Sequence, residues 1–103
     1  MEYIVHQKER KKLSGDEIEE ELKAIDGWEI EDGKLHREFK FENFIEAFAF
    51  MTKIAFVAER LNHHPQWSNV YNKVEMWLST HDVDGISHLD FDLAQAANLY
   101  GGD

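Results

Sequence analysis

Residues 31–61 of the 103-residue chain read EDGKLHREFKFENFIEAFAFMTKIAFVAERL, and the spacing of apolar side chains changes within this stretch. Asp32-Gly33 is typical of a tight turn between two strands. The residues from Leu35 to Phe41 then place apolar side chains on one face of a predicted strand and polar side chains on the other. From about Glu42 to Leu61 the apolar residues recur at helical spacing instead. The stretch therefore predicts a hairpin followed by a long helix.

The segments on either side of this stretch carry similar signals. Helix starts are indicated by a serine with an acidic residue three positions later, helix ends by glycine, and a break by His63-His64-Pro65. The elements expected there are a helix capped by Ser14 and Glu17 and ended by Gly27, a strand from Trp28 to Ile30, strands from Trp67 to Tyr71 and from Val74 to Thr80 joined by Asn72-Lys73, and a helix capped by Ser87 and Asp90 and ended by Gly101.

This order of elements predicts the fold class. Hairpins separated by helices, in the order α-β-β-α-β-β-α, are typical of an α+β fold in two layers. We expect a four-stranded antiparallel sheet with the three helices packed on one face. The sequence contains no repeat, low-complexity tract or Pro/Gly-rich linker, so we expect residues 1–103 to form a single domain.

The charge balance and the composition exclude several classes of protein. The chain carries 21 Asp and Glu against 11 Lys and Arg, which gives a formal net charge of −10 at pH 7. A field of this sign repels phosphate backbones, so we expect no nucleic-acid partner and interpret the short basic cluster Lys8–Lys12 as a solvated arm. The absence of cysteine excludes a disulfide scaffold and a thiol nucleophile. No segment resembles a signal peptide or approaches the roughly 20 apolar residues of a membrane span, which predicts a cytoplasmic protein without membrane contact.

The long helix carries more apolar residues than one buried face requires. One continuous stripe at helical spacing consists of Phe44, Phe48, Met51, Ala55, Ala58 and Leu61. Phe50 and Val57 form a second apolar set about a hundred degrees away, beside charged residues. A helix on the surface of a monomer needs one apolar stripe, so we expect this second set to contact another copy of the chain. The alternative is that Phe50 and Val57 are scattered exposed residues, which soluble proteins tolerate.

Three of the six histidines fall where predicted elements end, which is where catalytic residues tend to lie. His63 and His64 follow the long helix, and His81 follows the last strand. Glu59 precedes His63 by four positions, so its carboxylate is expected to orient that imidazole, or else to form an ordinary surface pair. Pro65 favours an extended His64, and successive extended residues point to opposite sides.

This geometry argues against a metal site built from the histidines. His63 and His64 are not expected to bind one ion together, and no HExxH pattern is present. We therefore predict no metal and no other cofactor. The remaining histidines are interpreted as residues without a functional role, His6 and His36 facing solvent and His88 in the first turn of a helix. Trp77 is expected to point away from the core.

Three segments together resemble the pterin-4a-carbinolamine dehydratase family. They are the run from Glu59 to Trp67, the run from Val70 to Val74, and the run from Leu78 to Asp82. The family pattern is an acidic residue, three further positions, His-His-Pro, an aromatic residue, a histidine and a later aspartate. It is met by Glu59, His63, His64, Pro65, Tyr71, His81 and Asp90, and the resemblance extends over nearly the whole chain.

The resemblance implies a dehydratase that converts 4a-hydroxytetrahydropterin into quinonoid dihydropterin, and so recycles the cofactor of aromatic amino-acid hydroxylases. It implies catalytic His63, His64 and His81, with His64 chiefly in binding, and supporting Glu59 and Asp90. Contacts to the pterin would come from His63, His64, Pro65, Trp67, Thr80, His81, Asp82 and Val83.

The resemblance also implies partners and alternatives. Family members form dimers or tetramers, so we expect a homodimer or homotetramer through the Phe44–Leu61 helix. Animal members double as a dimerisation cofactor of a transcription factor. A non-catalytic dimerisation or coactivator module, or an assembly chaperone of the same fold, is therefore the alternative to the enzyme.

Overall fold

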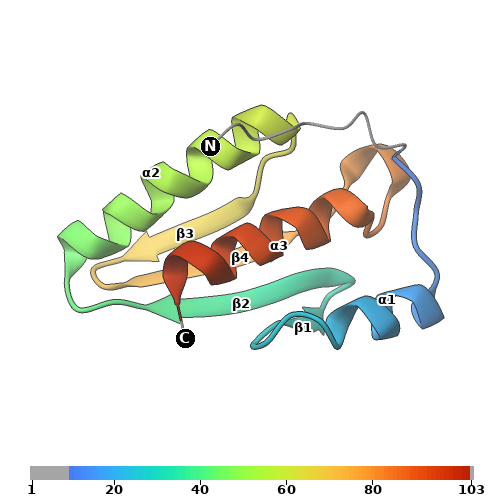
Figure 1. The fold of residues 1–103 in the computed structure, drawn as a ribbon, viewed down its shortest axis with the longest axis horizontal. Coiled ribbons are helices and arrows are strands. Elements are labelled where there is room, and N and C mark those ends of the chain that lie inside the picture. Colours follow the sequence, from blue (N-terminus) through green and yellow to red (C-terminus); the bar gives the residue numbers. More distant parts are fainter. Residues whose placement is uncertain (1–9, 103) are drawn as a thin grey trace.

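The structure is a computed structural model that describes residues 10–102. It contains three α-helices, a 3₁₀ turn and one antiparallel sheet with strand order β1-β2-β4-β3. Helices α2 and α3 lie side by side over one face of the sheet, and α1 lies beside its β1 end (Figure 1). The elements are α1 Gly15–Leu22, β1 Glu29–Glu31, β2 Lys34–Lys40, α2 Phe44–Leu61, β3 Gln66–Val70, β4 Lys73–Leu78, η1 His81–Val83 and α3 His88–Gly101. The predicted α+β fold and element order are confirmed.

Local side-chain chemistry sets the ends of these elements. The Ser14–Glu17 and Ser87–Asp90 pairs both form the predicted capping boxes. Asp32 and Gly33 have φ values of 53° and 74°, as a two-residue hairpin turn requires. The second hairpin turns one residue earlier than predicted, at Tyr71-Asn72, and Tyr71 takes a φ of 52°.

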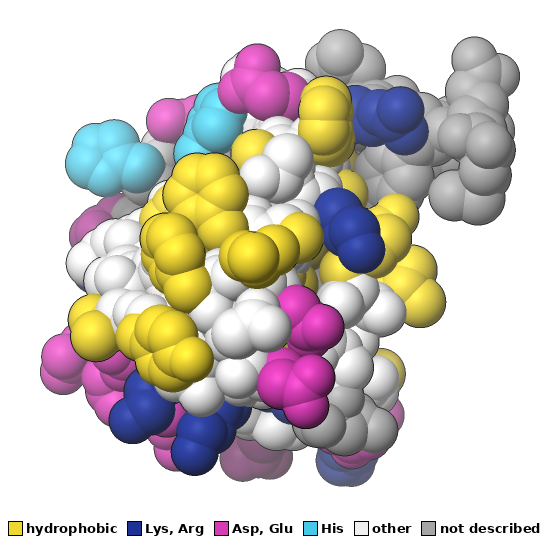
Figure 2. All heavy atoms as spheres, turned by 90° about the vertical axis from the view of Figure 1, so that its left-hand side faces the viewer, with side chains coloured by type: hydrophobic (Ala, Val, Ile, Leu, Met, Phe, Trp, Pro, Cys, Tyr) yellow, Lys and Arg dark blue, Asp and Glu magenta, His cyan; other side chains and the backbone are white. Residues whose placement is uncertain are grey.

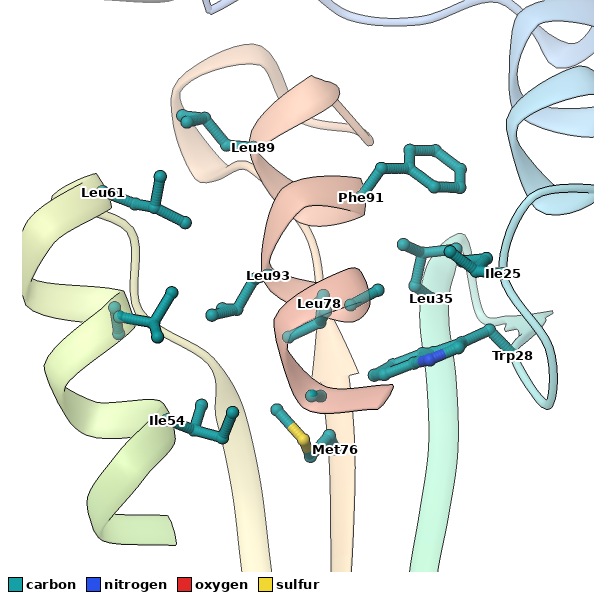
Figure 3. Close-up of a cluster of buried hydrophobic side chains, with 14 of the residues drawn as sticks. Ile25, Trp28, Leu35, Ile54, Leu61, Met76, Leu78, Leu89, Phe91 and Leu93 are labelled. Atoms are coloured by element: carbon teal, nitrogen blue, oxygen red, sulfur yellow. The ribbon is translucent and has the colours of Figure 1, made fainter. Parts of the chain in front are cut away.

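The core lies between the sheet and the two longer helices. Ile54 and Leu61 of α2 point toward Leu93 of α3, and Met76 and Leu78 of β4 form the floor beneath them (Figure 3). Burial of apolar area of this kind is the main favourable contribution to folding, at roughly 25 cal/mol per Å². None of the helices in the described part of the chain is long and apolar enough to span a membrane.

The expected orientation of α2 is wrong. Phe50 and Val57 belong to the core, with Phe50 only 2% exposed, whereas Phe44 and Phe48 face outward and Phe48 is 56% exposed. Both sets follow helical spacing, but Ala47 and Ile54 extend the set that contains Phe50 into a complete buried face. The surplus apolar surface of α2 therefore exists on the face that contains Phe44 and Phe48. Figure 2 shows hydrophobic side chains gathered on the side of the molecule where α2 begins.

His36 is a second correction, because it is buried and not exposed to solvent. It lies on the sheet face that the helices do not cover, and 9% of it is accessible. Its Nδ1 lies 3.0 Å from Glu29 Oε2, its Nε2 lies 2.7 Å from Glu75 Oε2, and Glu31 approaches within 3.6 Å of Nδ1. Trp77 points away from the core, as predicted, and its ring is tilted by 38° against that of His36, with the centroids 5.3 Å apart. Long side chains from the two neighbouring strands, β1 and β4, thus cover the imidazole. His6 lies outside the described residues, as do Lys8 and Glu9 of the basic cluster.

We expect these carboxylates to make stability depend on pH. Burial of His36 disfavours its charged form, but the hydrogen bonds to Glu75 and Glu29 and the charge of Glu31 outweigh burial and raise its pKa above 6.5. A raised folded-state pKa contributes stability that is fully present below pH 6.5 and is lost as the pH rises through the folded value. In urea unfolding at pH 6–9, His36→Gln should therefore lower the free energy of unfolding most at the acid end.

The matched control for this measurement is His88→Gln, which removes an exposed histidine at the start of α3. This variant should follow the wild-type dependence on pH. A constant difference between the wild type and His36→Gln across the range would contradict the role given to the imidazolium.

Candidate active site

The predicted site residues come from four elements that meet at one end of the sheet. The C-terminal end of α2 leads through His63-His64-Pro65 into β3, and β4 leads through Thr80 into η1. The first turn of α3 follows directly and lies beside η1 (Figure 1). Polar side chains at the ends of these elements therefore share one edge of the fold.

His63 is joined to Asp90 inside the molecule. The imidazole Nε2 donates to Asp90 Oδ1 at 2.5 Å, and the two side chains are 6% and 0% exposed. The buried carboxylate thus orients the imidazole ring through one of its two nitrogens.

Asp90 is itself held by two further donors. Thr80 Oγ1 donates to Asp90 Oδ2 at 2.7 Å, and the backbone N–H of Ser87 donates to the same oxygen at 3.0 Å. Because the Thr80 proton is used in this way, Ser87 Oγ donates to Thr80 Oγ1, at 2.6 Å. Each of these side chains is fully buried, so the network fixes the carboxylate that faces His63.

Glu59 contacts a different histidine from the one predicted. Its carboxylate accepts from His64 Nε2 at 2.6 Å, and both side chains are largely exposed. The expected Glu59–His63 pair assumed that the helix continues to residue 63. In fact Asn62 ends α2 in the left-handed region, with φ 52° and ψ 45°, and turns the chain so that His63 points inward. His63 and His64 point to different partners, as the extended geometry predicted.

The other predicted site residues lie around these two pairs. His81, Asp82 and Val83 form η1, where His81 and Asp82 are exposed. The turn is closed by backbone hydrogen bonds from Val83 N to Thr80 O and from Asp84 N to His81 O. Pro65 is half-buried, and Trp67 of β3 packs its ring against the core. None of these residues lines the groove of about 600 Å³ that lies between α2 and α3.

Two further residues belong to the site that sequence reasoning did not assign to it. Ser87 was recognised as a helix cap, but its hydroxyl also holds Thr80. Arg10 was read as part of a solvated arm, yet its guanidinium donates to the carbonyl of Asn62 at 2.8 Å. The serine–aspartate spacing marked the Ser87 position, whereas nothing local in the sequence signalled the Arg10 contact.

Among the described residues, the potential ligand atoms of Glu29, Glu31 and His36 lie close enough together to hold a metal ion. This group lies on the sheet face that the helices leave uncovered, away from the candidate histidines.

Comparisons with known proteins identify relatives of this chain. The model of the family described as pterin 4 alpha carbinolamine dehydratase matches residues 11–100. A Prochlorococcus marinus protein, provisionally named a pterin-4-alpha-carbinolamine dehydratase, is 56% identical over 88 residues, or 85% of this chain and 92% of its own. A Christiangramia forsetii protein with the same provisional name is 54% identical over 85 residues, or 82% and 88% of the two chains.

A solved structure shares the fold. It is described as a transcriptional coactivator/pterin dehydratase from Brucella melitensis, and it superposes with a TM-score of 0.86 at 42% identity. The match covers 89% of this chain and all of the other. On the family match and these identities, the chain belongs to the pterin 4 alpha carbinolamine dehydratase family.

Proposed function

We propose that the protein is a 4a-hydroxytetrahydropterin dehydratase, which releases water from the 4a-carbinolamine and forms quinonoid dihydropterin. The observation that carries this proposal is the orientation of His63, whose Nε2 is held by the buried carboxylate of Asp90. In a chain of this family, an oriented imidazole supports a role as general acid or base at the expected position.

The reaction needs only proton transfer. The hydroxyl group at C4a accepts a proton and leaves as water, with the electrons of the C–O bond. The adjacent ring nitrogen loses its proton, and the electron pair of that N–H bond forms the C=N bond. One general acid and one general base with pKa values near neutrality can perform both steps, and each positioned group contributes typically about 10²–10⁴-fold.

We assign the two proton transfers to His63 and His81, which come from different elements. His64 is assigned to substrate binding, with Glu59 as the carboxylate that orients it through the 2.6 Å hydrogen bond. Asp90 is a positioning residue for His63. Trp67, Pro65 and the chain from Thr80 to Val83 are proposed to contact the pterin ring and its edge.

Stopped-flow absorbance with synthetic 4a-hydroxytetrahydropterin tests this function. The purified protein should accelerate dehydration above the slow uncatalysed rate, in proportion to enzyme concentration. The alternative, a non-catalytic dimerisation or coactivator module or an assembly chaperone, predicts a rate equal to the background. A background rate with folded protein would therefore remove the enzyme proposal.

We also propose that the protein forms a homo-oligomer through the outer face of α2. Phe44 and Phe48 are exposed there with ring centroids 5.9 Å apart, and Ile45 is 77% exposed beside them. Contiguous exposed apolar side chains of this kind mark interaction surfaces. The family resemblance supports the same idea, because it implies that family members associate through this helix.

Phe48→Glu should therefore lower the assembly state, because it would place an unpaired charge at an apolar contact. Sedimentation velocity at micromolar concentration should show the wild type as a dimer or tetramer and the variant as a smaller species. Ala24→Glu adds the same charge to an exposed position just after α1, outside this face, and should leave assembly unchanged. A wild type that sediments as a monomer would contradict this proposal. Phe50→Glu is unsuitable for the test because it would disrupt the core.

A further inference from the structure

The chain before α1 runs along the loops that carry the candidate histidines. The backbone N–H of Leu13 donates to the carbonyl of Ile86 at 2.8 Å, and Leu13 is buried. The side chain of Lys12 lies so close to Gly85 that an added Cβ there would come within 2.8 Å of it. These contacts fix the path of the segment, so that Arg10 arrives at the C-terminal end of α2.

Arg10 contacts both histidine-bearing loops at once. Its Nη2 donates to the carbonyl of Asn62 at 2.8 Å, and its Nη1 lies 3.7 Å from Asp82 Oδ2. Asn62 directly precedes His63, and Asp82 directly follows His81. The carbonyl of Asn62 is at the negative end of the α2 dipole, where a guanidinium is favoured. A planar, forked group is well suited to hold two acceptors at a fixed separation.

The exposed part of η1 has little else to hold it against α2. Thr80 is anchored through Asp90, whereas the backbone N–H groups of Val83 and Asp84 donate within the turn itself, to the carbonyls of Thr80 and His81. The Arg10 pair with Asp82 therefore adds a side-chain contact that links this turn to the loop before His63. An exposed ion pair contributes little to stability, so the consequence of this contact is geometric.

We propose that Arg10 is a positioning residue that sets the separation between the His63–His64 loop and the His81 turn. This inference rests on the proposed dehydratase function. Arg10 lies one residue before the range 11–100 that the family model matches, so family membership assigns it no role. It would act through the backbone at Asn62 and through Asp82, without touching the reacting atoms.

The test compares Arg10→Gln and Arg10→Lys with Lys11→Gln, which removes the same charge from the adjacent exposed position. A displacement of catalytic groups by about 1 Å can lower the reaction rate about 10²-fold, and a partial loosening of their positions should lower it less. We expect Arg10→Gln to lower kcat about fivefold to tenfold, with KM changed less than about twofold. Arg10→Lys keeps the positive charge but lacks the forked guanidinium group, so its kcat should fall nearly as far. Lys11→Gln should retain the wild-type kcat and KM.

A second readout separates this inference from the proposed function. Long-range ¹H–¹⁵N correlations of the imidazoles should show shifted His81 and His63 signals in Arg10→Gln and unchanged signals in Lys11→Gln. The Tm should fall by no more than about 4 °C, since surface pairs contribute little. Absence of turnover by the wild type would overturn the proposed dehydratase function. The imidazole signals would still show whether the Arg10 contact positions His63 and His81. Unchanged signals and unchanged kcat in Arg10→Gln, or wild-type kcat in Arg10→Lys, would overturn the positioning role.

Discussion

Replacing His63 with alanine should lower kcat for dehydration of 4a-hydroxytetrahydropterin by about 10²-fold or more, because the variant loses a positioned proton-transfer group. The same loss is expected for His81→Ala. Binding of a pterin that cannot react should weaken only modestly in both variants, because the two imidazoles are proposed to transfer protons only in the transition state. Stopped-flow rates corrected for the uncatalysed reaction would measure kcat, and fluorescence titration would measure binding.

His64→Ala is the matched comparison for these two variants. His64 lies next to His63 in the chain, but it is exposed and paired with Glu59. Its removal should raise KM with little change in kcat, which is the signature of lost uniform binding. If His81→Ala retained the wild-type kcat after correction, the pairing of His63 with His81 would be wrong even with the dehydratase activity intact. The double variant His63→Ala/His81→Ala should lose less kcat than the product of the two single losses if water can replace either imidazole.

Asp90→Ala should have the largest effect on stability. The carboxylate is fully buried and accepts hydrogen bonds from His63, from Thr80 and from the backbone of Ser87. Its removal leaves these donors unsatisfied in the interior, and breaking a buried pair in this way typically costs about 3–5 kcal/mol. For a domain of about this size, the Tm should fall by more than about 10 °C. Urea and thermal unfolding would measure both quantities.

Glu59→Ala provides the control for that measurement. It also removes a carboxylate from a histidine, but the pair with His64 is largely exposed. Such pairs contribute about 0–1 kcal/mol, so the free energy of unfolding should change little. Equal losses of unfolding free energy in Asp90→Ala and Glu59→Ala would show that burial of the Asp90 network does not govern its contribution to stability.

Local chemistry explains why much of the fold is predictable from the sequence. The Asp32-Gly33 turn needs positive φ at adjacent positions, and these residues tolerate it. The capping boxes at Ser14 and Ser87 satisfy backbone groups within a few residues of themselves. Because each of these signals depends on neighbours in the chain, no knowledge of the tertiary structure is needed to interpret it.

The errors arise where tertiary contacts or a single backbone conformation decide the outcome. Two faces of α2 are periodic and apolar, and packing against the sheet selects the one that contains Phe50. Helical spacing placed Glu59 beside His63, but the left-handed conformation of Asn62 redirects the chain. His36 is on the polar face of its strand, yet side chains from the neighbouring strands bury it. The predicted pairings and exposures were therefore wrong where packing or a single backbone conformation decides them, and the roles of the site residues stay a prediction.

The hydrogen bond between His63 and Asp90 spans 27 positions, and the entire β3–β4 hairpin lies between its two ends. A partly folded chain with the hairpin formed and α3 undocked would hold His63 without its carboxylate. Closing a segment of this length costs entropy that only the packed core offsets. Any activity that depends on an oriented His63 would therefore appear late in refolding. On heating, it would vanish in the same cooperative transition as the native fold, so that turnover would report the population of fully folded molecules.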